Sequence, residues 1–198
     1  MNDHIKLVGI SGSLRKGSYN TMLLKAALQL LPDDVSMNIL SIENIPLYNA
    51  DLDLPAAGQR PQVIDDFRKA IAGSDGILIS SPEYNYSIPG GLKNAIDWAS
   101  RGEDSPLLHK PIAVIGATTG LWGTVRMQTA FHPVFVFLDM RPVYKPEVLV
   151  SQAEKKFDKD GNLIDETAKK LLRQKLQALK DLIHLHVHAG DVLDTKII

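Results

Sequence analysis

Short apolar runs alternate with longer segments in which apolar residues recur at helical spacing. The runs predict buried strands at residues 5–10, 35–40, 76–80, 112–115 and 141–148. The helical spacing predicts helices at residues 21–31, 63–72, 92–99, 125–137 and 165–185, with Pro133 bending or ending the fourth. Near-continuous apolar strands separated by helices are typical of a parallel sheet that is covered on both faces. The pattern therefore predicts a doubly wound α/β domain of three layers.

One domain accounts for nearly all of this pattern. The chain has 198 residues, which is enough for one sizeable core and short for two. We assign residues 1–185 to this domain and residues 186–198 to a C-terminal tail with little helical pattern. His184, His186 and His188 would face one side of an extended segment, but no carboxylate pattern accompanies them, so we predict no metal site.

The composition argues against several classes of function, including nucleic-acid binding, membrane insertion and cysteine chemistry. The formal net charge is −1 and 23% of the residues are charged, so no strong field favours nucleic acid or an anionic membrane. No apolar run approaches the roughly 20 residues that span a bilayer. The first residues lack the pattern of a secretory signal, and the expected location is the cytoplasm. The chain has no cysteine, which excludes disulfides, iron–sulfur clusters and a cysteine nucleophile.

Polar loops are expected at one edge of the sheet, because ligands of such folds bind at the carboxyl ends of the strands. Residues 11–20 (SGSLRKGSYN) combine hydroxyls, glycines and the start of a helix. Such a loop can hold an anion through backbone N–H groups, and Arg15 adds a charged donor. It has neither a Walker ending nor the glycine spacing of a dinucleotide loop, so a phosphate monoester is the better fit. The plainer alternative is a tight turn in which Ser18 or Asn20 caps the helix.

A second loop, after the third strand, is rich in tyrosine and proline. Residues 80–94 read SSPEYNYSIPGGLKN. Prolines stiffen this segment, and its amides, hydroxyls and aromatic rings suit a flat heteroaromatic ligand. A surface turn whose tyrosines cover the edge of the sheet would explain the same residues.

A third loop follows the fourth strand. Residues 116–126 read GATTGLWGTVR, and the small residues among them let the backbone approach a ligand. Trp122 suits either the mouth of a pocket or an interface. The sequence leaves these two interpretations open.

Two of these stretches, GSLRKGSYN and SPEYNYSIPGGLKNAIDWASR, resemble the NADPH-dependent FMN reductase family, in particular its quinone, chromate and azo-dye reductase branch. The spacing of the motifs also matches, so the resemblance covers residues 5–183. It implies a flavodoxin-like three-layer sandwich, with a five-stranded parallel sheet of order 2-1-3-4-5 and helices on both faces. It also implies FMN as the cofactor. Carried over position by position, it implies these FMN-binding residues: Ser13, Arg15, Ser18, Tyr19 and Asn20 around the phosphate, Pro82, Glu83, Tyr84 and Asn85 beside the isoalloxazine ring, and Thr118, Thr119 and Gly120 in the third loop.

The third loop departs from the family pattern at two positions. The family usually has consecutive hydroxyl residues just after the fourth strand and a glycine pair further on, whereas here Ala117 and Thr124 replace one member of each. Backbone contacts survive these changes, and Thr118 or Thr119 would supply the missing hydroxyl. The resemblance also implies a homodimer or homotetramer. Trp98 would lie either at the subunit contact or in the core.

The resemblance implies an enzyme in which the flavin N5, and no side chain, carries the chemistry. NADPH or NADH would give a hydride to the flavin and leave. A quinone, chromate, an azo compound or a similar small acceptor would then enter the same space, in a ping-pong order. The alternative is a flavodoxin-like electron carrier that docks on a protein partner. The near-neutral charge counts mildly against it, because such carriers tend to be strongly acidic.

Overall fold

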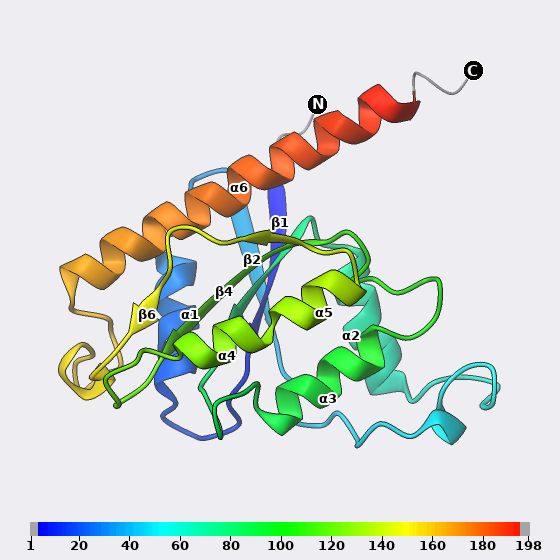
Figure 1. The fold of residues 1–198 in the computed structure, drawn as a ribbon, viewed down its shortest axis with the longest axis horizontal. Coiled ribbons are helices and arrows are strands. Elements are labelled where there is room, and N and C mark those ends of the chain that lie inside the picture. The colour runs from blue at the N-terminus through cyan, green and yellow to red at the C-terminus, as the bar shows by residue number, and fades with distance from the viewer. Residues whose placement is uncertain (1–3, 195–198) are drawn as a thin grey trace.

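The computed structural model describes the backbone of residues 4–194 and the side chains of residues 4–186. Five parallel strands form a sheet in the order β2-β1-β3-β4-β5, and a short sixth strand pairs with β4 (Figure 1). The predicted strand order is therefore confirmed, with one strand added. The strands are β1 (Ile5–Ser11), β2 (Val35–Leu40), β3 (Gly76–Ser80), β4 (Pro111–Ala117), β5 (Arg141–Val143) and β6 (Leu149–Val150).

Helices cover both faces of the sheet, as predicted. One face carries α1 and α6, and the other carries α2 to α5 (Figure 1). The helices are α1 (Tyr19–Gln29), α2 (Gln62–Ala72), α3 (Gly90–Ala99), α4 (Val125–Ala130), α5 (His132–Phe137) and α6 (Glu166–Asp194), with 3-10 turns at Ala50–Leu52 and Ala153–Lys155. No helix in the described part of the chain combines the length and apolar character needed to cross a bilayer.

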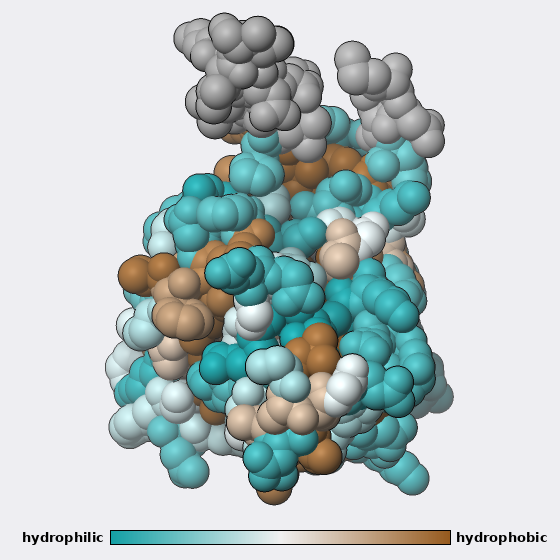
Figure 2. All heavy atoms as spheres, turned by 90° about the vertical axis from the view of Figure 1, so that its right-hand side faces the viewer, coloured by the Kyte–Doolittle hydropathy of each residue, from teal (hydrophilic) through white to brown (hydrophobic). Residues whose placement is uncertain are grey.

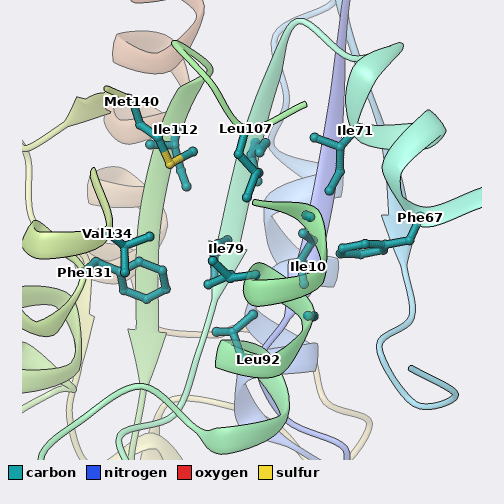
Figure 3. A pocket seen from close by; sticks show the side chains of 14 residues that line it. Ile10, Phe67, Ile71, Ile79, Leu92, Leu107, Ile112, Phe131, Val134 and Met140 are labelled. Carbon is teal, nitrogen blue, oxygen red and sulfur yellow. The ribbon is translucent and has the colours of Figure 1, made fainter. Parts of the chain in front are cut away.

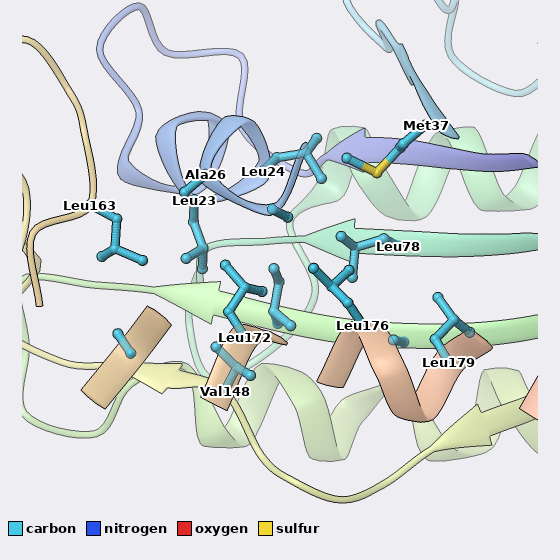
Figure 4. Close-up of a cluster of buried hydrophobic side chains, with 14 of the residues drawn as sticks. Leu23, Leu24, Ala26, Met37, Leu78, Val148, Leu163, Leu172, Leu176 and Leu179 are labelled. Atoms are coloured by element: carbon cyan, nitrogen blue, oxygen red, sulfur yellow. The ribbon is translucent and has the colours of Figure 1, made fainter. Parts of the chain in front are cut away.

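Each face of the sheet has its own apolar core, because successive side chains of a strand point to opposite faces. Leu78 joins the core under α1 and α6, together with Leu23 and Leu176 (Figure 4). Its neighbours Ile77 and Ile79 join the other core. That second core encloses an apolar cavity of about 20 Å³ (Figure 3), which has room for about one water molecule and none for a cofactor.

One predicted helix and one predicted strand are shorter in the structure than in the sequence pattern. The helix predicted for residues 125–137 is divided into α4 and α5, and Pro133 occupies the first turn of α5, where its missing N–H group costs nothing. The fifth strand predicted within residues 141–148 is present as β5, but it covers only Arg141–Val143. The chain leaves the sheet after Val143 and returns as β6, which pairs with the end of β4.

The terminal helix is longer than predicted. Helix α6 continues to Asp194, beyond the end expected at residue 185, so the segment with His184 and His186 is helical rather than extended. Side chains two positions apart on a helix point in directions roughly 200° apart, so His184 and His186 do not share one side of α6. The side chain of His188 and residues 195–198 of the predicted tail lie outside the described residues. The division into a domain and a tail at residue 186 stays a prediction.

A buried lysine fastens α6 to the connection between β5 and β6. The side chain of Lys175 is 2% exposed, and its amine donates hydrogen bonds to the carbonyl groups of Val143 and Tyr144. Burial lowers the pKa of Lys175 to about 8. The contact holds the segment that leads into β6, and β6 in turn supports the end of β4.

This lowered pKa makes the stability of the fold depend on pH. Lys175 keeps its proton up to about pH 10.5 in the unfolded chain and loses it near pH 8 in the fold, so folding releases a proton between these values. The free energy of unfolding should therefore rise with pH across this window, by about 3 kcal/mol from this residue. Urea unfolding should show that Lys175→Met loses this rise. The control Lys170→Met, on an exposed position of α6, should keep it, and equal pH dependence in both variants would contradict the argument.

Candidate cofactor-binding site

Three loops meet at the carboxyl edge of the sheet, as predicted for the ligand site. They are the β1 loop (residues 12–18), the β3 loop (residues 81–89) and the β4 loop (residues 118–124). Backbone hydrogen bonds join them at their origins, from Gly12 N–H to the Ser80 carbonyl (2.8 Å) and from Ser81 N–H to the Ile115 carbonyl (3.1 Å). Gly12 is required by this contact, since a Cβ atom there would lie 2.4 Å from the Ser81 hydroxyl. The three loops therefore start from one hydrogen-bonded frame.

Asn20 connects the start of α1 to the end of β4. Its buried amide donates to the Ala117 carbonyl (2.9 Å) and accepts from the Ala117 N–H group (2.8 Å). The Ser80 hydroxyl also donates to its oxygen at 3.4 Å. The side chain that was expected beside the phosphate is therefore used inside the protein, which leaves its backbone for the predicted cofactor contact.

Ser18 likewise serves the protein itself. It is buried, it is the N-cap of α1, and its hydroxyl accepts a hydrogen bond from Asn20 N–H at 3.2 Å. The plainer interpretation of this residue, as a helix cap, is the one the structure adopts. Its contact with a phosphate stays a prediction.

Arg15 and its neighbours form the exposed part of the β1 loop. The Arg15 side chain is exposed, with its guanidinium carbon 5.9 Å from the centre of the Tyr19 ring. Tyr19 packs on Phe157 at 5.5 Å, and the Ser13 hydroxyl accepts from Arg15 N–H at 3.3 Å. A guanidinium group, a serine-rich loop and the start of α1 together suit an anion.

The β3 loop ends in a tight turn that presents two tyrosines. Tyr84 and Ser87 exchange backbone hydrogen bonds of 3.2 and 3.0 Å, and Asn85 and Tyr86 between them have φ values of 50° and 64°. Two central residues with positive φ define the turn type of short hairpins, which asparagine tolerates and tyrosine seldom adopts. The turn leaves the rings of Tyr84 and Tyr86 exposed. Such strain in a loop at a ligand edge is typical of functional positions.

Glu83 joins the β3 loop to the first turn of α4. Its carboxylate accepts hydrogen bonds from the N–H groups of Arg126 (2.9 Å) and Met127 (3.1 Å) and lies 3.4 Å from the Arg126 guanidinium. That guanidinium carbon is also 4.1 Å from the centre of the Tyr86 ring and 5.4 Å from Trp122. Glu83 was expected to border the flavin ring, but its carboxylate is occupied by these contacts, and Pro82 beside it is half-buried. The sequence does not reveal Arg126 as the partner, because only the fold brings the two loops together.

β6 and the turn after it support the β4 loop. Thr118 N–H donates to the Val150 carbonyl (2.9 Å), and the carbonyl groups of Thr118 and Gly120 accept from Ala153 (3.0 Å) and Gln152 (3.1 Å). The Thr118 hydroxyl accepts from Gly120 N–H at 3.2 Å, whereas Thr119 is exposed. Of the two threonines expected to replace a hydroxyl at position 117, Thr119 therefore has the freer side chain.

The backbone at Thr124 explains the glycine that the family usually has there. Thr124 has φ 69° and ψ 23°, a left-handed conformation that glycine adopts readily and a β-branched residue does not. Its buried hydroxyl has no hydrogen-bond partner among the described residues. A Cβ atom added to Gly116 would lie only 2.1 Å from this hydroxyl. The replacement noticed in the sequence is therefore a strained one.

Exposed apolar side chains collect on the three loops. They are Leu14, Tyr84, Tyr86, Leu121 and Trp122, each more than half exposed. Trp98, in contrast, is fully buried in α3 and donates to the Pro46 carbonyl (2.8 Å), so it belongs to the core and not to a subunit contact. We call the five exposed residues the apolar rim. Beside the cationic β1 loop, the rim fits the chemistry of FMN, which joins a flat heteroaromatic ring to a phosphate. The described side chains include no group of three or more placed to hold a metal ion.

Fold and loops together define a flavodoxin-like flavoprotein. The family model for NADPH-dependent FMN reductase matches residues 5–155. An NAD(P)H-dependent FMN reductase of Pseudomonas aeruginosa is 47% identical over 180 residues, which cover 91% of this chain and 96% of that protein. An NAD(P)H:quinone oxidoreductase of Solanum tuberosum is 45% identical, covering 90% and 92% of the two chains. The solved structure of FerB, a flavoenzyme NAD(P)H:(acceptor) oxidoreductase from Paracoccus denitrificans, superposes with a TM-score of 0.82 at 32% identity, covering 92% and 98%.

The chain belongs to the NADPH-dependent FMN reductase family. The resemblance stated from its motifs is thus confirmed, as are an oxidoreductase activity, FMN as the cofactor and NAD(P)H as the cosubstrate. These findings decide against the electron-carrier alternative. The individual flavin contacts of the twelve predicted residues stay predictions.

Removing the Asn20 amide should weaken the frame of the site. Asn20→Ala leaves the buried N–H and carbonyl groups of Ala117 without these partners, which should lower the free energy of unfolding by about 3 kcal/mol. Ser80→Ala removes only the long contact to the same amide and should cost less than about 1 kcal/mol. Chemical denaturation measures both values. Equal losses of unfolding free energy in the two variants would show that the hydrogen bonds between Asn20 and Ala117 contribute no more than the Ser80 contact.

Relieving the strain at Thr124 should stabilise the protein. Thr124→Gly permits the left-handed backbone and removes a buried hydroxyl without a partner, so the free energy of unfolding should rise by about 1 kcal/mol. The same change at Thr129, inside α4, should lower it by about 1 kcal/mol. A thermal or urea unfolding series compares the two. A loss of stability at both positions would contradict the strain argument.

Proposed function

We propose that this enzyme passes two electrons from NAD(P)H through FMN to quinones or similar small acceptors. The observation that carries the proposal is the apolar rim beside the cationic β1 loop, at the convergence of three loops. The similarity to a quinone oxidoreductase of Solanum tuberosum supports quinones as the acceptor class. Chromate and azo compounds are further acceptors under this proposal.

The side chains would bind and orient, and the flavin would supply the redox chemistry. FMN held there would supply two-electron redox chemistry between a reduced nicotinamide and an acceptor. Arg15 would contact the phosphate through a charge-assisted hydrogen bond. Tyr84 and its neighbours in the rim would contact the ring system and exclude water from it.

We propose that nucleotide and acceptor use the same exposed side of the rim in turn, which gives a ping-pong order. Glu83 and Arg126 satisfy one another. The rim therefore offers an incoming acceptor mainly apolar and aromatic contacts. Such contacts suit flat quinones and select weakly among them.

A homodimer or homotetramer and a cytoplasmic location are also part of the proposal. Figure 2 shows apolar side chains gathered at the left edge of the molecule. This edge is the front of the molecule in Figure 1, where α5 lies. The outer residues Val136 and Phe137 of this helix are 82% and 72% exposed, which supports a subunit contact there. The cytoplasm supplies the reduced nicotinamide nucleotides that the reaction consumes.

Arg15→Ala tests the phosphate contact on which the cofactor assignment depends. Loss of one charge-assisted contact should raise the Kd for FMN by about tenfold or more, measured by quenching of flavin fluorescence on binding. Arg173→Ala, on an exposed position of α6, is the matched control and should leave the Kd unchanged. Unchanged affinity in both variants would overturn the predicted phosphate site. Oxidation of NAD(P)H with benzoquinone as the acceptor, in the absence of any other protein, tests the activity itself.

A further inference from the structure

A second hollow opens on the far side of the β1 loop from the three-loop site. It has a volume of about 320 Å³ and lies between the β1 loop, the first turn of α1 and the end of β2 with the residues that follow it. In the sheet, β2 is the neighbour of β1 opposite to β3. The hollow adjoins the predicted cofactor site and shares residues with it. Ser13 and Arg15, which are predicted to contact the FMN phosphate, line the hollow, and so does Leu14 of the apolar rim. Leu14 also lies 3.9 Å from the Cβ position of Gly91 at the start of α3.

The walls of the hollow have charges of both signs and an apolar floor. Lys16 and Arg15 provide the positive charge, and Glu43 provides the negative charge. Ile39 and Leu14 supply apolar surface that is 36% and 58% exposed.

Local hydrogen bonds hold two parts of the wall in place. The hydroxyls of Ser11 and Thr21 lie 2.9 Å apart, and the Ser41 hydroxyl accepts from Glu43 N–H at 3.2 Å. One hydrogen bond thus links the end of β1 to α1, and the other holds the backbone turn that carries Glu43 just beyond β2.

The apolar surface, the cation and the carboxylate of this hollow match the chemical groups of an adenosine phosphate. An adenine ring packs on apolar surface, and ribose hydroxyls donate to a carboxylate placed beyond the second strand in doubly wound folds. A phosphate on the ribose needs a cation. Arg15 lies over the Tyr19 ring, which leaves Lys16 as the cation that serves this hollow alone.

We infer that this hollow binds the adenosine end of the dinucleotide, with Lys16 contacting the 2′-phosphate of NADPH and Glu43 opposing it. The inference rests on the proposed function, because the nicotinamide end of the same molecule must reach the rim. Leu14 lies between the two sites, and the dinucleotide would pass over it. The preference between NADPH and NADH is then set by two side chains of opposite charge.

Calorimetric titration of the FMN-loaded protein with adenosine 2′,5′-bisphosphate tests this directly. Lys16→Gln should raise the Kd at least about fivefold, and Glu43→Gln should lower it. Lys25→Gln removes the same charge from an exposed position of α1 outside the hollow and should leave the Kd unchanged. Adenosine 5′-monophosphate should bind more weakly than the bisphosphate, and inorganic phosphate should not displace the bisphosphate.

Steady-state kinetics provide the second readout. The ratio of kcat/KM for NADPH to that for NADH should fall at least about fivefold in Lys16→Gln and rise in Glu43→Gln. Equal Kd and ratio in Lys16→Gln and Lys25→Gln would overturn the inference, as would equal binding of the bisphosphate and monophosphate. A protein that binds the bisphosphate through Lys16 but fails to bind FMN would overturn the proposed function and support the assignment of the hollow.

Discussion

The hydrogen bonds between the buried Asn20 side chain and the backbone of Ala117 hold the carboxyl edge of the sheet together. The β3–β4 ladder ends at Ser80 and Ile115, where β3 turns away into its loop. Alternate residues of a strand direct their N–H groups to opposite sides, and those of Gly116 and Thr118 are bonded to the segment around β6. Ala117 therefore faces the side from which β3 has departed. The Asn20 side chain takes the place of the missing strand there, because an amide offers both a donor and an acceptor.

Support for the opposite side of β4 comes from far along the chain. β6 pairs with Gly116 and Ala117, and Lys175 holds the preceding segment through the carbonyl of Val143. A buried ammonium group is costly unless its hydrogen bonds are satisfied, and its lowered pKa reflects that cost. The end of β4 is thus fixed from both sides, by α1 and by α6, so the loop that follows it begins from a rigid strand.

The sequence predicts the fold and the location of the site better than the use of each site residue. β2 and β3 have the predicted bounds, since turn residues flank the alternating pattern of β2 and the continuous apolar run of β3. The two-residue strand β6 has no periodicity to detect, and α6 passes Gly190 because a glycine costs a helix only about 1 kcal/mol. Ser18, Asn20 and Glu83 were identified from motifs, but a hydroxyl, amide or carboxylate has the same hydrogen-bonding capacity toward a ligand as toward the protein. Only the three-dimensional arrangement shows that their side chains bind the protein.

The use of polar side chains within the protein affects how the enzyme discriminates between substrates. The side chains of Ser18, Asn20 and Glu83 are used within the protein, and the large side chains left facing outward are apolar, aromatic or cationic. A surface without unpaired polar groups aimed at a substrate discriminates weakly between substrates of similar shape, because no group loses a partner when the wrong one binds. Strong discrimination requires charge, and the hollow beside the β1 loop has exposed charges at Arg15, Lys16 and Glu43. Under the proposed function and the proposed adenosine site, the enzyme would be permissive toward its acceptor and selective toward its nucleotide.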